Sequence, residues 1–352
     1  MSVTRVRNLA FESVESTALT ASRAALVGLV LLFAGFRLVD FRPSLATQAA
    51  VYLVGMVALN LPHGGYEHFA NLRRRARQFR YGYVAGYLAA ATAFAGLFLV
   101  APVAGLTLAI TVAVLKGGGG DLHVLRATTG TSHLRSRPQR WLAVAARGGA
   151  VMAVPIVVSP ETFYAFSAMM VAMVDPGALA PAARHIDATR LLVGTGYGAV
   201  VLAHLGWGGC TRTGDGAWRA DAAETCLLVT YFAVVPVVVA VGLYFPLWYS
   251  LRQVARELRV DATVDEGPDL LGGDATGAGT VALRAWGVLV AGALATAAVA
   301  VGFALALPNP FPTGSLRFDG VAFWSVFISV IALPHVVVGS VLDRGRGIWH
   351  VP

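Results

Sequence analysis

The chain has 352 residues, of which 57% are hydrophobic and only 13% are charged. An ordinary soluble domain carries about 25% charged residues, so this composition excludes a soluble globular protein. The formal net charge is +8, but the basic residues stand in short segments between apolar runs. That pattern is typical of membrane proteins, and we expect no nucleic-acid partner. Lys116 is the only lysine among many arginines, a bias that suggests a GC-rich, halophilic genome.

The apolar runs predict about ten transmembrane helices in one integral membrane domain over residues 1–352. Short proline-containing or polar segments separate most of the runs. In chain order the predicted spans are 22–39, 45–63, 81–100, 102–116, 140–158, 161–175, 189–207, 225–249, 281–307 and 322–342. The predicted fold class is therefore an all-α polytopic transmembrane helical bundle.

The arginines predict the orientation of this bundle. Basic segments occur at 72–80, 116–140, 251–259 and the C-terminus. With ten spans and a cytoplasmic N-terminus, all of them face the cytoplasm, as the positive-inside rule requires, and the C-terminus is cytoplasmic too. The loop after span 7, which holds Arg212, Asp221 and Glu224, is then predicted to face the opposite side. Residues 260–279 are predicted to form a flexible cytoplasmic loop.

Polar side chains interrupt the apolar pattern at the cytoplasmic ends of four predicted spans. Ionisable groups at such depths usually face the bundle interior, although a single one can also extend its charged end to the lipid headgroups. His63 and Glu67 are four residues apart, as are Tyr249 and Gln253, a spacing that places both side chains on one helix face. Four such clusters on one side favour a shared site. His204, nearer the other side, is predicted to be structural.

The run Gly117–Gly120 invites comparison with a phosphate-binding loop. It lacks the Gly-Lys-Ser/Thr ending of that motif. Four consecutive glycines are instead interpreted as a close backbone turn.

Five short motifs in order now show a resemblance. Leu61–His68 reads Leu-Pro-His-Gly-Gly-Tyr-Glu-His and resembles the Leu-Pro-His-Gly-Ala-x-Asp-His motif of the membrane-bound β-carotene 15,15′-dioxygenase family, the bacterioopsin-related-protein type. Lys116–Leu122 resembles its His-Phe-Gly-x-x-Asp segment, and Tyr244–Gln253 resembles its Leu-Trp-His-Ser-x-Arg-His segment. Arg147–Gly149 and Leu333–Val337, the latter with a late Leu-Pro-His, are also similar. The resemblance covers about residues 55–343.

The resemblance implies an activity and a site. The family cleaves β-carotene centrally with O2 into two molecules of retinal, and a ferrous ion held by histidines is implied. The presumed iron histidines fall on His63, Lys116, Tyr249 and Gln253, so that only His63 remains as a candidate metal ligand. The candidate substrate-pocket residues are His63, Glu67, His68, Lys116, Asp121, Trp248, Tyr249, Gln253 and His335.

Three functions stay open at this point. The first is the family's dioxygenase activity on a carotenoid at the lipid bilayer. The second is an iron-free relative that binds a carotenoid or retinal and passes retinal to an opsin. The third is a small-molecule transporter, which is disfavoured because the two halves show no repeated pair of interrupted helices.

Overall fold

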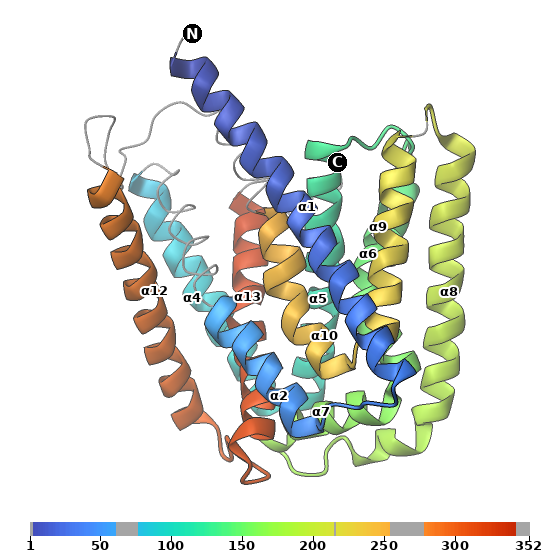
Figure 1. Ribbon diagram of the computed structural model, residues 1–352. Coiled ribbons are helices and arrows are strands. Elements are labelled where there is room, and N and C mark those ends of the chain that lie inside the picture. Colours follow the sequence, from blue (N-terminus) through green and yellow to red (C-terminus); the bar gives the residue numbers. More distant parts are fainter. Residues whose placement is uncertain (1–2, 61–76, 215, 254–277, 343–352) are drawn as a thin grey trace.

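The computed structural model describes residues 3–60, 77–214, 216–253 and 278–342, and every regular element in those ranges is a helix. Many of the helices run up and down between the two ends of one bundle (Figure 1). In chain order the elements are α1 (Val3–Leu38), α2 (Leu45–Leu53), η1 (Val54–Leu59), α4 (Arg77–Val100), α5 (Pro102–Thr128), α6 (Arg137–Val158), α7 (Pro160–Ala172), η2 (Ala180–His185), α8 (Ile186–Thr211), α9 (Gly216–Val234), α10 (Val237–Tyr244), η3 (Phe245–Ser250), α12 (Ala278–Ala306) and α13 (Leu316–Leu342).

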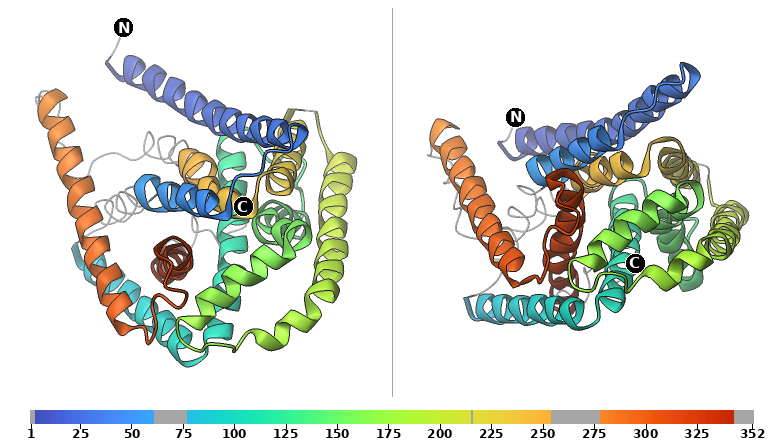
Figure 2. Two further views of the ribbon diagram at one scale, coloured as in Figure 1. Left: turned by 60° about the horizontal axis from the view of Figure 1, so that its bottom comes forward. Right: turned by 90° about the horizontal axis from the view of Figure 1, so that it is seen from below.

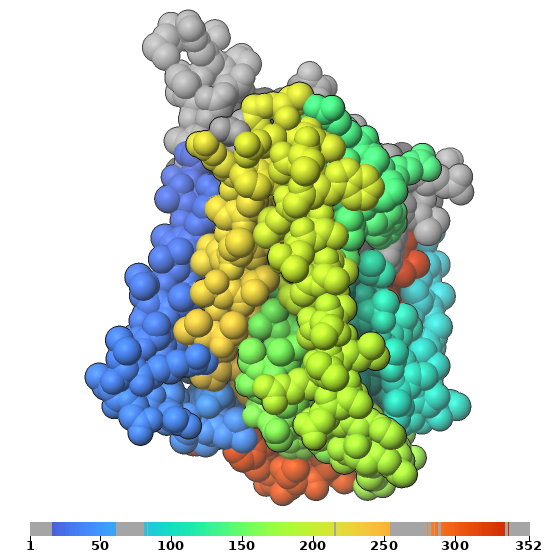
Figure 3. Space-filling view, turned by 90° about the vertical axis from the view of Figure 1, so that its right-hand side faces the viewer, coloured from blue at the N-terminus to red at the C-terminus, as the bar shows by residue number. Residues whose placement is uncertain are grey.

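The inner helices are α5, α6, α10 and α13, while α8 and α12 form opposite edges (Figure 2). Figure 3 shows α8 covering one side of the molecule from end to end. Large apolar side chains are exposed on that helix, among them Leu191, Leu192 and Leu202, and also on α12, where Leu305 is exposed. Exposed apolar surface of this extent suits contact with lipid rather than water.

Five helical stretches of the described chain are long and apolar enough to cross a bilayer. They are Ser16–Leu38, Pro102–Thr128, Arg137–Val158, Ala180–Thr211 and Leu316–Pro334. Leu45–Leu59, Val84–Val100 and Val290–Ala306 are shorter apolar helices. An all-helical bundle with these lengths and this composition agrees with the coarse prediction of a helical membrane protein.

Two buried aromatic clusters hold the bundle together. One surrounds Tyr231, Tyr244 and Trp248 and joins α1, α6, α9 and α10 with η3. The other contains Phe94 and Phe327 and joins α4, α12 and α13. Aromatic side chains bury the largest apolar areas, so these clusters set the relative positions of the helices on either side of the bundle centre.

Two of the predicted spans are wrong. Residues 161–175 do not form a full span, because α7 has 13 residues, which at 1.5 Å per residue is too short for a hydrocarbon core of about 30 Å. Residues 225–249 are not one helix. The chain turns at Pro236, which has an extended ψ of 135°, and α9 and α10 are separate helices on either side of it.

The predicted end of the span 102–116 is also wrong. Helix α5 continues to Thr128, so Lys116 lies in its middle and Gly117–Gly120 are helical rather than a turn. The glycines allow α5 and α6 to touch. A Cβ on Gly118 would collide with the Val144 carbonyl, and a Cβ on Gly148 would collide with the Val114 carbonyl.

The structure corrects the predicted placement of the segment after span 7. Asp221 and Glu224 lie in α9 and form ion pairs with Arg147, which in turn binds Asp121. Groups in direct contact lie at the same end of the bundle, so this segment does not face away from the 116–140 segment. The predicted loop 260–279 lies outside the described residues up to 277, and α12 begins at Ala278.

Candidate functional site

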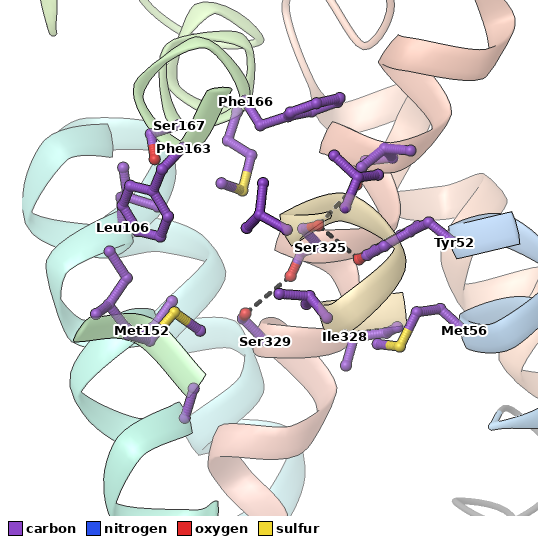
Figure 4. A pocket seen from close by; sticks show the side chains of 18 of the residues that line it. Tyr52, Met56, Leu106, Met152, Phe163, Phe166, Ser167, Ser325, Ile328 and Ser329 are labelled. Carbon is purple, nitrogen blue, oxygen red and sulfur yellow. Dashed lines mark hydrogen bonds between the residues drawn. The ribbon is translucent and has the colours of Figure 1, made fainter. Parts of the chain in front are cut away.

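A mostly apolar cavity lies between α2, α5, α7, α10 and α13, with Met152 of α6 at its edge (Figure 4). Its volume is about 140 Å³, close to that of an engineered apolar cavity, about 150 Å³, that takes up benzene. It therefore has room for one ring-sized apolar group. The lining residues are Tyr52, Met56, Leu106, Ala109, Ile110, Ala113, Met152, Thr162, Phe163, Phe166, Ser167, Met170, Val237, Val238, Val241, Phe245, Val321, Ser325, Ile328 and Ser329.

Three hydroxyl groups in the cavity wall donate their hydrogen bonds to the protein itself. Ser325 Oγ donates to the Val321 carbonyl at 2.7 Å, and Ser329 Oγ donates to the Ser325 carbonyl at 2.8 Å. Since the single Ser325 proton is used in this way, Tyr52 Oη, 2.6 Å from Ser325 Oγ, donates to it. These donors are satisfied without a ligand, so a hydrocarbon can occupy the cavity without leaving them unpaired.

The helix faces that line the cavity lead directly to the motif residues. On α5 the lining residues Leu106, Ile110 and Ala113 follow helical spacing, and Lys116 continues the same face one turn later. On η3, Phe245 lines the cavity, and its ring centroid lies 6.1 Å from that of Tyr249. Both helices run in the same direction in Figure 1, so Lys116 and Tyr249 lie beyond the same end of the cavity.

Lys116, Tyr249 and Gln253 come together at that end, and we call them the Lys116 cluster. Lys116 Nζ lies 5.3 Å from the centroid of the Tyr249 ring, within the range of a cation–π interaction. A Cβ on Gly120 would lie 2.7 Å from Gln253 Nε2 and 2.9 Å from Tyr249 Cε2. Glycine at this position therefore lets both side chains lie directly against α5.

Two π-helical turns, η1 and η3, belong to the helices that approach this cluster. Such wider turns occur frequently at functional sites. They also contact each other, because Ser250 Oγ donates to Asn60 Oδ1 at 3.1 Å. The contact joins the end of η3 to the residue that follows η1.

A set of charged side chains, all buried except the half-exposed Arg23, lies beside the Lys116 cluster, and we call it the charge network. It consists of Arg23 (α1), Asp121 (α5), Arg147 (α6), Asp221 and Glu224 (α9), and Arg252, which follows η3. Three guanidinium groups face three carboxylates, so the formal charges cancel. Buried charges are tolerated when they are paired and hydrogen-bonded in this way.

Arg147 and Arg252 are the centre of the charge network, and each is only 1% exposed. Arg147 donates to Asp121, Asp221 and Glu224 at 2.6–2.8 Å. Arg252 donates to Asp121 at 2.8 Å and to both Glu224 oxygens at 2.8 and 2.9 Å. The network therefore joins α5, α6, α9 and the helix that continues from η3, and Arg23 adds α1 through a 2.6 Å contact with Glu224.

Two buried histidines complete the surroundings of Asp221. His133 Nε2 lies 2.8 Å from Asp221 Oδ2, and His204 Nε2 lies 3.2 Å from the same oxygen. His204 thus has a carboxylate neighbour that the sequence did not reveal, and its structural role stays a prediction.

A model of the family described as "Beta-carotene 15,15'-dioxygenase" matches residues 54–343. The chain belongs to the β-carotene 15,15′-dioxygenase family. It is 54% identical over 338 residues, 95% of this chain and 94% of the relative, to a protein of Halobacterium salinarum named "Probable beta-carotene 15,15'-dioxygenase Brp", with the same values in strains R1 and NRC-1. It is 36% identical over 307 residues, 85% of each chain, to "Probable beta-carotene 15,15'-dioxygenase Blh" of strain NRC-1. No solved structure matches the chain.

The motif residues of this β-carotene 15,15′-dioxygenase family member separate into two groups. Lys116, Tyr249 and Gln253 converge beside the cavity, although none of them lines it. Asp121 belongs to the charge network, and Trp248 is fully buried with its ring 4.3 Å below the Arg252 guanidinium. Asp121 and Trp248 do not line this cavity, and their place in the substrate pocket stays a prediction.

The side chains of four further candidate pocket residues lie outside the described part of the structure. His63, Glu67 and His68 lie outside the described residues. His335 lies on α13, six residues beyond the lining residue Ser329, while its side chain is outside the described part. The prediction that these residues line the substrate pocket stays a prediction.

The described residues of this family member do not fit a histidine-held iron. They contain no group of three histidine, cysteine, aspartate or glutamate side chains arranged to hold a metal ion. At three of the presumed iron positions stand Lys116, Tyr249 and Gln253. A protonated lysine has no lone pair to donate, and a glutamine amide is a weak iron ligand.

The sequence analysis did not identify Arg147, Asp221 and Glu224 as a buried unit. A signal was present, because Arg147 stands within an apolar run and both acidic residues lie close to one. Charged residues within such segments usually face the bundle interior and pair with one another. The sequence pattern places the two acidic residues in a loop, whereas they lie on α9 opposite Arg147 of α6.

Proposed function

We propose that this chain is a membrane protein that takes one ring of a carotenoid into the central cavity and cleaves β-carotene to retinal. The activity is the one that the names of its Halobacterium relatives give. The observation that carries the proposal is the apolar cavity whose α5 and η3 walls lead to the Lys116 cluster. With a ring in the cavity, the polyene chain passes Phe245 and reaches the motif residues.

A second candidate function is supported by the same cluster. Lysine, tyrosine and glutamine stand where the family resemblance implies iron histidines, so a relative that binds a carotenoid or retinal without cleaving it is the alternative. Such a protein would use the cavity in the same way. It would supply retinal to an acceptor, for which an opsin is our proposed partner.

One experiment separates the two candidates. The full chain is produced in bacterial cells that accumulate β-carotene, and retinal is measured in extracts while iron is measured in the purified protein. Cleavage is supported by retinal above the level of cells without the chain. Carotenoid that co-purifies without retinal or iron favours the binding function. Neither retinal nor bound carotenoid would contradict both.

We also propose that the chain crosses the membrane with the ends of its bundle on opposite sides. Ser132, Thr213 and Asp175 are exposed. The α5–α6 and α8–α9 connections, which hold Ser132 and Thr213, lie at one end of the bundle, and the segment after α7, which holds Asp175, lies at the other (Figure 1). Single cysteines at these positions, in a variant with Cys210 and Cys226 replaced by serine, are labelled in intact vesicles with a membrane-impermeant maleimide. Ser132→Cys and Thr213→Cys are expected to react from the same side and Asp175→Cys from the other. Labelling of Ser132→Cys and Thr213→Cys from opposite sides would contradict this arrangement.

A further inference from the structure

We propose that Lys116 forms a Schiff base with the aldehyde group of a long apolar polyene, so that the protein holds retinal covalently. This rests on the proposed function, which makes retinal the product. The inference assigns a retention site for that product, at the end of the cavity where the Lys116 cluster lies.

Lys116 lies in the interior of its helix and close to the cavity. It is the 15th residue of the 27-residue helix α5, far from either end of that helix. It lies one helical turn beyond the cavity-lining residue Ala113 and on the same face. Gly117–Gly120 and Asp121, which follow it, are all buried. Lys116 thus lies one turn beyond the cavity wall, so a polyene whose ring occupies the cavity can extend its aldehyde end towards the amine.

Aromatic side chains lie between the cavity and the Lys116 amine. Phe245 lines the cavity and contacts Tyr249, whose ring lies 5.3 Å from Lys116 Nζ. Two aromatic rings thus connect the cavity with the amine. Aromatic faces suit a conjugated chain, and they also stabilise a cation by cation–π interaction. The protonated Schiff base carries the same positive charge as the protonated lysine that it replaces. The Tyr249 ring can therefore stabilise the positive charge before and after the imine forms.

The chemistry requires no redox partner. The neutral Lys116 amine is the nucleophile, and its nitrogen attacks the carbonyl carbon of the aldehyde. A carbon–nitrogen double bond replaces the carbon–oxygen double bond. The oxygen leaves as water with the two hydrogens of the amine. Hydrolysis reverses the reaction and returns retinal, so the site can store the aldehyde and release it.

The sequence makes this proposal unusually easy to test, because Lys116 is the only lysine of the chain. All-trans-retinal is added to the purified full-length protein in detergent, and the imine is reduced with cyanoborohydride. Intact mass and peptide mapping then locate the adduct. We expect one retinyl group per chain on the peptide that contains Lys116. The N-terminal amine serves as an internal measure of non-specific reaction.

Two controls keep the outcome clear. Lys116→Arg keeps the positive charge but cannot form the imine, and it should lose the adduct while its thermal unfolding stays that of the parent chain. Retinol, which has no aldehyde but the same apolar body, should compete with retinal and reduce labelling of the unchanged protein. The competition uses the unchanged protein. It therefore tests whether retinal reaches Lys116 through a specific site even if Lys116→Arg folds poorly.

The possible results separate this inference from the proposed function. Absence of an adduct at Lys116, or labelling that retinol does not reduce, overturns the inference. Retinal formation from β-carotene without an adduct leaves the proposed cleavage intact. An adduct in a protein that forms no retinal supports the covalent site and favours the binding function over cleavage.

Discussion

Replacing Arg147 by methionine is expected to lower the free energy of unfolding by about 3–5 kcal/mol, the cost of removing one partner from a buried ion pair. Arg147 is 1% exposed and contacts Asp121, Asp221 and Glu224. The variant leaves three carboxylates facing only Arg252 and the half-exposed Arg23. Thermal unfolding in detergent, followed by fluorescence-detected size-exclusion chromatography, measures the loss.

Matched variants test whether charge balance is the cause. Arg137→Met changes an exposed arginine on the same helix and should alter stability by less than about 0.5 kcal/mol. Adding Glu224→Gln to Arg147→Met restores the equality of charges, and the double variant should lose less than the sum of the two single losses. Simple additivity of the two effects would contradict the charge network as a coupled unit.

Filling the cavity is expected to abolish carotenoid binding and retinal formation while leaving the protein folded. Ala113→Phe adds a ring of about the size that the cavity accommodates. Substitution into existing space avoids the strain of overpacking, and we expect a stability change below about 1.5 kcal/mol. Co-purified carotenoid and retinal are measured in carotenoid-producing cells. The adduct at Lys116 is measured with added retinal, and it should be lost as well.

The control for this variant lies on the same helix. Ala104 is exposed and does not line the cavity, so Ala104→Phe should keep carotenoid binding. Full retinal formation by a folded Ala113→Phe variant would show that the ligand does not enter the cavity. Loss of function in both variants would point to a general effect of phenylalanine on α5 instead.

The helical class and the family could be predicted from the sequence, because long apolar runs and short motifs are local properties. The motif positions also led to the Lys116 cluster, since Lys116, Tyr249 and Gln253 do converge. Chain turns inside apolar segments could not be predicted in the same way. The run around Pro236 is apolar on both sides, and hydropathy does not distinguish one long helix from two helices joined at a turn.

The charge network shows a second limit of sequence patterns. The sequence pattern places Asp221 and Glu224 in a loop, because both stand between the predicted spans 189–207 and 225–249. The cost of burying these acidic groups is offset by Arg147 and Arg252, which are 74 and 28 residues away from Asp221 and Glu224 respectively. The sequence of α9 does not indicate which residues of other helices pair with its acidic side chains. The tertiary contacts are needed to explain why these side chains are buried.

The π-helical turn η3 makes chain length itself a constraint at this site. If Phe245–Ser250 narrowed to an α-helical turn without losing a residue, every later side chain would rotate by about 100° around the helix axis. Tyr249, Arg252 and Gln253 would then leave α5 together. Among relatives of this protein, an α-helical turn at this place keeps the same side-chain faces only if it is one residue shorter, so we expect a one-residue gap wherever the π-helical turn is lost.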